Sequence, residues 1–188
     1  KKSIISSLGD YASTVLIDSN FGPSLISSFP KTCLPMMAFE ADVYHISDKD
    51  RITKLPDNIS ISDFSKIGYK VLKFFMYYAP NDDSEINNQK QQIIENIGKE
   101  CVANNISFLM EPLVYDPFKK PGSLDYAFLK PKLVEQATKI FSHPKFNINI
   151  LKVEVPVDLS FVEGFGDPIM KQSDAIKCFK EASKAAGD

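Results

Sequence analysis

Residues Lys70–Tyr77 read Lys-Val-Leu-Lys-Phe-Phe-Met-Tyr, an almost continuously apolar run interrupted by one lysine, Lys73. A run of this length and composition is typical of a β-strand that is covered on both faces. Four further runs of the same kind occur along the chain, at Ser13–Ile17, Leu34–Phe39, Ile106–Met110 and Asn149–Pro156. Longer amphipathic or polar stretches separate the runs, and this alternation predicts β/α units around a parallel sheet.

The stretches between and after these runs predict four helices, at Ser60–Ile67, Ser84–Asn104, Lys130–Phe141 and Ser173–Ala186. Ser84 occupies the expected N-cap of the second helix, and Pro131 lies in the expected first turn of the third. Pro117–Ser123 has the composition of a loop. Because no Gly-, Ser- or Pro-rich linker divides the chain, residues 1–188 are predicted to form one structural unit.

The composition argues against several classes of function. The net charge is −2, the isoelectric point is about 5.8, and Arg51 is the only arginine among 22 basic residues. No basic patch of the kind that binds a phosphate backbone occurs, so we expect no nucleic-acid partner. No apolar stretch reaches the roughly 18 residues of a spanning helix, and no segment has the pattern of a signal peptide. The sequence therefore predicts a cytoplasmic protein without a membrane partner.

The cysteines and histidines do not form a recognisable metal or disulfide pattern. Three cysteines lie far apart in the sequence, and His45 and His143 are separated by almost a hundred residues. An odd number of widely spaced cysteines argues against a disulfide framework. Two distant histidines do not match the spacing of a zinc site. We therefore expect buried thiols and no metal.

Three apolar runs contain or end on a charge. Lys73 lies inside one run, Glu111 ends the Ile106–Met110 run, and Lys152 lies inside the last. Lysine and glutamate are rarely buried without a partner, because an unpaired buried charge is costly. The carboxyl ends of parallel strands form the ligand side of such sheets. One shared pocket explains the three charges more simply than three separate exceptions.

Three other charged residues at strand ends have competing interpretations. Asp18 is equally compatible with a turn former and with a site residue. Glu40 is best explained as the first solvated residue after a strand, and Glu154 as the structural partner of a neighbouring lysine.

A pair of lysines beside one carboxylate points to a particular chemistry. A desolvated lysine in a partly cationic pocket has a lowered pKa, so its neutral amine can attack a ketone and form a Schiff base. A nearby carboxylate can move protons to and from the carbinolamine and a substrate hydroxyl. The residues therefore favour carbon–carbon bond chemistry through an iminium ion, with no metal and no cofactor.

Several strings resemble the tagatose 1,6-bisphosphate aldolase family. The most specific is Leu-Lys-Val-Glu-Val-Pro-Val at Leu151–Val157, followed by Val-Glu-Gly-Phe at Val162–Phe165. Other similar strings lie in the same order along the chain, at Val15–Asp18, Leu55–Asp57, Val71–Phe74, Ile97–Ala103, Phe108–Asp116 and Phe146–Ile148. The resemblance covers nearly the whole chain.

The resemblance implies a class I aldolase on a (β/α)8 TIM barrel. Such an enzyme cleaves D-tagatose 1,6-bisphosphate to dihydroxyacetone phosphate and glyceraldehyde 3-phosphate, so its partner is a phosphorylated ketose. By the resemblance, Lys152 matches the Schiff-base lysine and Glu111 the carboxylate credited with proton transfer. Lys73 matches the second active-site lysine and Asp18 a substrate-binding acid at the end of the second strand.

The chain departs from the family pattern in two ways. Lys54 replaces the arginine that precedes Leu-Pro-Asp in the family, and it meets a phosphate only as a point charge. Aligned to the family, the chain is a partial barrel that covers about strands two to six, and the absent strands carry phosphate-binding groups. A related Schiff-base lyase for another ketose phosphate or a sulfosugar phosphate, and a non-catalytic regulatory barrel, remain alternatives. Homo-oligomerisation is left open.

Overall fold

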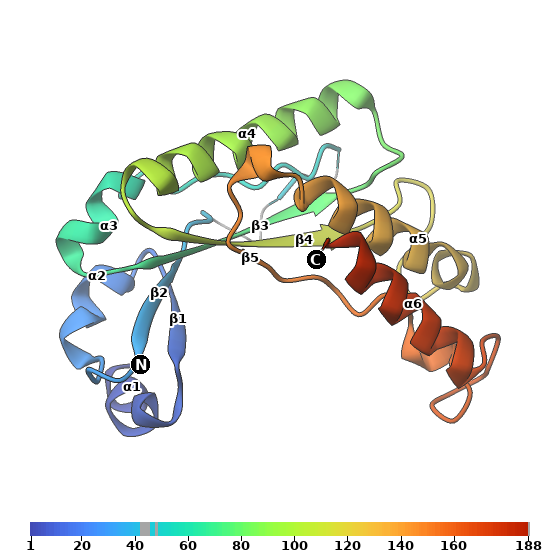
Figure 1. Ribbon diagram of the computed structural model, residues 1–188, viewed down its shortest axis with the longest axis horizontal. Coiled ribbons are helices and arrows are strands. Elements are labelled where there is room, and N and C mark those ends of the chain that lie inside the picture. The colour runs from blue at the N-terminus through green and yellow to red at the C-terminus, as the bar shows by residue number, and fades with distance from the viewer. Residues whose placement is uncertain (42–45, 48, 188) are drawn as a thin grey trace.

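The computed structural model describes residues 1–41, 46–47 and 49–187. These residues form a five-stranded sheet in which the strands follow chain order and every neighbouring pair is parallel. The strands are β1 (Thr14–Asp18), β2 (Leu34–Ala38), β3 (Val71–Tyr78), β4 (Ser107–Val114) and β5 (Ile150–Leu151) (Figure 1). Each predicted apolar run corresponds to one strand, so the prediction of a parallel α/β sheet is confirmed.

Six α-helices precede, connect or follow these strands in the described residues. They are α1 (Lys2–Leu8), α2 (Gly22–Leu25), α3 (Ile61–Ile67), α4 (Ser84–Ala103), α5 (Leu124–Phe141) and α6 (Gln172–Ala185). Figure 1 shows the long helix α4 running along the strands, with α5 and α6 packed together near β5. The four predicted helices are confirmed as α3, α4, α5 and α6. The sequence analysis missed α1 and α2, which are too short to show a helical stripe.

Two expected helix starts were wrong. The N-cap of α4 is Asp83, whose Oδ1 accepts hydrogen bonds from the N–H groups of Glu85 at 2.7 Å and Ile86 at 3.4 Å. Pro131 lies inside α5, which begins seven residues earlier, at Leu124. A proline inside a helix removes one backbone hydrogen bond, and here the burial of the surrounding apolar face on the sheet compensates for that loss.

The strand expected at Asn149–Pro156 is much shorter than predicted. In the described residues, β5 covers only Ile150–Leu151, and two backbone hydrogen bonds flank it: the Asn149 N–H donates to the Phe108 carbonyl at 3.0 Å and the Lys152 N–H to the Met110 carbonyl at 2.9 Å. Beyond it, the Glu154 carboxylate accepts the Val114 N–H at 2.6 Å. A side chain thus takes the place of the backbone carbonyl that a longer strand would supply.

The two faces of the sheet have different roles. Alternate residues of β3 and β4 form the core with α4 and α5, and none is more than slightly exposed; they are Leu72, Phe74, Met76, Tyr78, Phe108 and Met110. Because strand side chains alternate, Lys73, Phe75, Leu109 and Glu111 point to the opposite face. The expectation of strands covered on both faces holds for β3, but β4 buries alternate residues.

A glycine in α4 allows close packing against the segment that leads into β5. A Cβ added at Gly98 would lie 1.9 Å from the carbonyl oxygen of Phe146, which belongs to a short 3-10 helix, Pro144–Phe146. Real Cβ atoms do not approach an oxygen so closely. This glycine therefore sets how near α4 lies to the chain before β5.

We expect Gly98→Ala to lower the free energy of unfolding by about 1–3 kcal/mol, because the helix or the Phe146 backbone must move. At an ordinary exposed helix position the same change stabilises by about 1 kcal/mol. Urea denaturation measures the difference. Val102→Ala, on an exposed part of α4, is the control and should change stability by about 0.5 kcal/mol or less. A stabilising Gly98→Ala would contradict the packing argument.

Candidate active site

The candidate site lies on the sheet face opposite the core. Phe75 in β3 is paired with Glu111 in β4, and Met110 is paired with Leu151, so Lys152 follows directly beside Glu111. On the other side, Ala38 in β2 is paired with Lys73 in β3. Glu40 follows Ala38 by two residues, so its side chain lies on the same face of the sheet. Residues from four neighbouring strands therefore meet on this face: Glu40 and Lys152 lie just past the ends of β2 and β5, and Lys73 and Glu111 lie within β3 and β4.

These residues form a row of alternating charges. The Lys152 Nζ lies 2.5 Å from Glu111 Oε1, and the Lys73 Nζ lies 3.3 Å from Glu111 Oε2. The Lys73 Nζ also lies 2.5 Å from Glu40 Oε1. The structure thus brings together Lys73, Glu111 and Lys152, as the shared-pocket hypothesis requires. One carboxylate is shared by both lysines.

The two lysines differ in burial, and not in the way the sequence predicted. The side chain of Lys73 is 11% exposed, whereas that of Lys152 is 62% exposed. The expectation that the Schiff-base lysine is desolvated is therefore wrong for Lys152 in the described residues. Lys152 lies just past β5, and its N–H makes the last backbone hydrogen bond described for this ladder, to the Met110 carbonyl at 2.9 Å.

Glu40 is a site residue that the sequence analysis misjudged. It was expected to be solvated, but its side chain is only 5% exposed and it pairs with Lys73. Burial raises the pKa of Glu40, and the charge and hydrogen bond of Lys73 oppose this effect. The signal was present in the sequence, because Glu40 follows an apolar run in the same way that Glu111 does.

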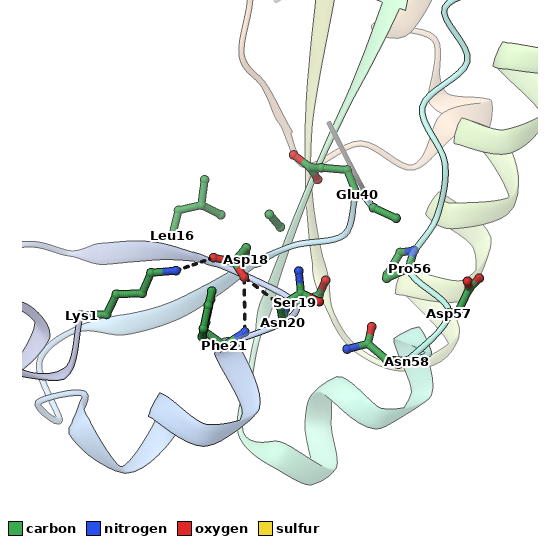
Figure 2. A pocket seen from close by; sticks show the side chains of 12 residues that line it. Lys1, Leu16, Asp18, Ser19, Asn20, Phe21, Glu40, Pro56, Asp57 and Asn58 are labelled. Atoms are coloured by element: carbon green, nitrogen blue, oxygen red, sulfur yellow. Dashed lines mark hydrogen bonds and ion pairs between the residues drawn. The ribbon is translucent and has the colours of Figure 1, made fainter. Parts of the chain in front are cut away.

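Asp18 both shapes a turn and lines a pocket. Its Oδ1 accepts the N–H groups of Asn20 at 3.2 Å and Phe21 at 3.3 Å, which is the turn-forming role. Its Oδ2 pairs with the Lys1 Nζ at 3.0 Å (Figure 2). The open pocket has a volume of about 870 Å³ and also contains Glu40. The turn-forming interpretation of Asp18 is therefore confirmed, and its role as a substrate-binding residue stays a prediction.

The pocket is rich in hydrogen-bonding groups. Asp57 of the Leu-Pro-Asp string lines it, together with Asn20 and Asn58. Glu40 connects the pocket with the charged row. It lines the pocket, and it pairs with Lys73 in the row. The side chain of Lys54 is exposed, and its carbonyl accepts the Ala41 N–H at 2.9 Å beside Glu40.

Glu154 is a structural residue, as expected, but its main partner is not a lysine. The Lys130 Nζ lies 4.0 Å away, whereas the Val114 N–H bond is 2.6 Å long. Burial raises the pKa of Glu154 above its ordinary value of 4.5, against the opposing effects of Val114 and Lys130.

A second buried charge was missed altogether. Lys90 in α4 is fully buried, and its Nζ donates to the Tyr115 hydroxyl at 3.0 Å, which in turn donates to Asp82 at 2.5 Å. Burial lowers the pKa of Lys90 to about 8. Its place on the apolar stripe, four residues after Ile86, was the available signal.

The remaining sequence predictions have mixed outcomes. Cys33 and Cys101 are buried, but Cys178 is only partly buried. His45 lies outside the described residues. Within residues 1–41, 46–47 and 49–187, no cluster of three or more His, Cys, Asp or Glu side chains could hold a metal ion. In the same ranges, no helix is both long and apolar enough to cross a membrane.

Comparison with known proteins places this site in a family context. Residues 2–187 match the DeoC/LacD family aldolase. The chain belongs to this family of aldolases. Among curated members, the tagatose 1,6-diphosphate aldolases of Staphylococcus aureus strains JH9 and Newman are each 38% identical over 181 residues. The match covers 95% of this chain and 56% of each relative, so the chain spans about half their length. The resemblance seen in the sequence is confirmed.

Solved structures support the same fold. An archaeal fructose 1,6-bisphosphate aldolase has a TM-score of 0.64 and 12% identity, over 96% of this chain and 57% of that one. A second structure of an archaeal fructose 1,6-bisphosphate aldolase, with the catalytic lysine covalently bound to the carbinolamine intermediate, has a TM-score of 0.63, also at 12% identity, over 95% of this chain and 57% of that one. The prediction of part of a TIM barrel is therefore confirmed for this DeoC/LacD family chain.

The raised pKa of Glu154 predicts a pH-dependent stability. The folded state keeps a proton on Glu154 at pH values where the unfolded state has lost it, so this group lowers the free energy of unfolding as pH rises above 4.5. Glutamine does not titrate. We expect the stability of Glu154→Gln relative to wild type to increase with pH above 4.5, measured by urea denaturation across a pH series.

Glu95 supplies a control of opposite sign. Its hydrogen bond from Lys99 lowers its pKa below 4.5, so Glu95→Gln should lose stability relative to wild type as pH rises toward 4.5 and should change no further above that value. The free energy of unfolding of Glu154→Gln minus that of wild type should rise with pH above 4.5. If this difference stays flat or falls, burial does not disfavour the ionised form of Glu154.

Proposed function

We propose that the protein is a class I aldolase that cleaves D-tagatose 1,6-bisphosphate to dihydroxyacetone phosphate and glyceraldehyde 3-phosphate. In this proposal, Lys152 forms the Schiff base, Glu111 transfers protons, Lys73 supplies a fixed positive charge, and Asp18 binds the substrate. The observation that carries the proposal is the Glu111 carboxylate, which lies 2.5 Å from the Lys152 Nζ and 3.3 Å from the Lys73 Nζ.

The shared carboxylate is suited to the first chemical step. A lysine must lose its proton before it attacks a ketone, and Glu111 is close enough to take the proton of Lys152 directly. The amine then attacks C2 of the ketose, and Glu111 returns a proton to the carbonyl oxygen. Loss of water leaves an iminium ion at the position of the former ammonium group.

The same residues can complete the reaction. The C3–C4 bond breaks as its electron pair moves toward the iminium nitrogen, and the C4 hydroxyl gives its proton to Glu111. The aldehyde product leaves, and Glu111 gives the proton it has just accepted to C3 of the enamine, which returns Glu111 to its carboxylate form. Water then hydrolyses the new iminium ion and releases dihydroxyacetone phosphate. Lys73 stays positively charged beside Glu111 throughout, so the carboxylate does not lose its counterion when Lys152 reacts.

The choice of substrate rests on the family relatives. The curated proteins that are 38% identical to this chain are tagatose 1,6-diphosphate aldolases. The polar pocket beside Glu40 offers carboxylate and amide groups to the hydroxyls of a sugar. A phosphorylated sugar is too polar to cross a bilayer unaided, so we place the activity in the cytoplasm.

Borohydride reduction in the presence of dihydroxyacetone phosphate tests the proposal in the full-length protein. We expect one stable adduct on the peptide that contains Lys152, because reduction fixes the iminium ion. Lys152→Met should remove this adduct and lower kcat by at least about 10³-fold, as expected for loss of a nucleophile. Peptide mass mapping and a coupled assay for glyceraldehyde 3-phosphate give the two measurements.

Lys99→Met is the matched control for this experiment. Lys99 is 60% exposed and pairs with Glu95 at 2.6 Å, which closely matches the exposure and pairing of Lys152. It lies on α4, away from the charged row, and its loss should leave both adduct and turnover unchanged.

The proposal would be disproved if wild-type protein formed no adduct on Lys152. An adduct with cleavage of only another ketose phosphate or a sulfosugar phosphate would overturn the substrate, and an adduct without any cleavage would overturn the activity.

A further inference from the structure

Glu40 has an unusual position for a charged residue. Its Oε1 lies 2.5 Å from the Lys73 Nζ, and its Oε2 is buried without a hydrogen-bond partner among the described residues. Leaving a carboxylate oxygen buried and unpaired is costly, and a buried ion pair is a weak source of stability. The presence of Glu40 at this position is therefore poorly explained by a contribution to stability. It is better explained by the effect of Glu40 on Lys73.

Burial alone would favour the wrong lysine as nucleophile. Removal from water favours the neutral amine of a lysine, and the neutral amine is the form that attacks a ketone. Lys73 is 11% exposed and Lys152 is 62% exposed, so desolvation acts more strongly on Lys73. Something must oppose this effect if Lys152 is to carry the Schiff base.

The groups around the Lys73 Nζ supply that opposition. Glu40 at the end of β2 and Glu111 of β4 both lie within ion-pair distance, at 2.5 and 3.3 Å. The ring of Phe75 lies 4.6 Å from the same nitrogen, and its face attracts a cation. Lys152, the other lysine of the charged row, contacts the other oxygen of Glu111, Oε1. Lys73 therefore has two carboxylates, whereas Lys152 has a share in one.

We propose that Glu40 is a positioning residue that holds Lys73 in its ammonium form, so that Lys152 alone is available to form the Schiff base. This inference rests on the proposed aldolase function. Glu40 does not touch the reacting carbon in this account. It acts through Lys73, and Lys73 in turn fixes the charge beside Glu111.

The charge-removing variant Glu40→Gln tests this role in the full-length protein. Glutamine keeps the size of the side chain and an oxygen for Lys73 but removes the negative charge, so more of Lys73 becomes neutral. With dihydroxyacetone phosphate and borohydride, we expect an adduct on Lys73 at about ten times its wild-type level or more. The alkaline limb of the kcat/KM profile should also move to lower pH by about one unit, the usual effect of losing an adjacent opposite charge.

Two variants separate the charge of Glu40 from a purely structural role. Glu40→Asp keeps the charge and should restore labelling confined to Lys152. Glu154→Gln is the matched control, because Glu154 is also a partly buried carboxylate with a raised pKa near the same strand ends. It should leave the site of labelling unchanged, whatever its effect on stability.

A variant that leaves Glu40 intact keeps the inference testable if Glu40→Gln does not fold. In Lys152→Met the usual nucleophile is absent, and Lys73 should still form no adduct because Glu40 remains. An adduct on Lys73 in Lys152→Met would overturn the inference. So would Glu40→Gln protein that folds but is labelled only on Lys152 with an unchanged pH profile. Neither result would affect the proposed function, which fails if wild-type Lys152 forms no adduct or if D-tagatose 1,6-bisphosphate is not cleaved.

Discussion

The parallel pairing of β3 with β4 is the constraint on which the rest of the structure depends. The two strands are paired along their whole length, from Val71 with Ser107 to Tyr78 with Val114. Because side chains alternate along a strand, this register decides at once which residues enter the core and which face the site. A shift of one residue in either strand would place Lys73 or Glu111 against the helices and an apolar side chain in the site. The core and the chemistry are therefore fixed by the same hydrogen bonds.

Much of this arrangement could be predicted because it is encoded locally. Apolar runs identify all five strands, since each run reports the burial of its own residues. Lys73, Glu111 and Lys152 could be selected because a charge inside an apolar run conflicts with its surroundings, and that conflict is visible without knowledge of the fold. The role of Asp18 as a substrate-binding acid came from the family resemblance, and its local sequence alone left a turn equally acceptable.

Other features depend on contacts between distant segments and were missed. Glu40 looks like a solvated residue after a strand, and what buries and pairs it is a lysine 33 residues further along the chain. The length of β5 could not be read from its apolar composition, because the Glu154 side chain replaces the backbone as the partner of Val114. Pro131 is tolerated inside α5 because the helix face around it is buried on the sheet. In each case tertiary contacts outweigh the local pattern.

The charged row also explains how a lysine can react in a site where it is half exposed to water. Its two carboxylates and two ammonium groups balance each other when all four are ionised. Transfer of the Lys152 proton to Glu111 neutralises one pair of the row, and formation of the iminium ion beside the ionised Glu111 restores both charges at almost the same places. The fixed charges that hold the resting ammonium of Lys152 are therefore already arranged to stabilise the cationic intermediate, with no reorganisation during the reaction. A single buried lysine without this row would also be neutral, because desolvation favours the neutral amine. It would lack the nearby charges that stabilise the cationic iminium ion, and the cleavage step needs that cation.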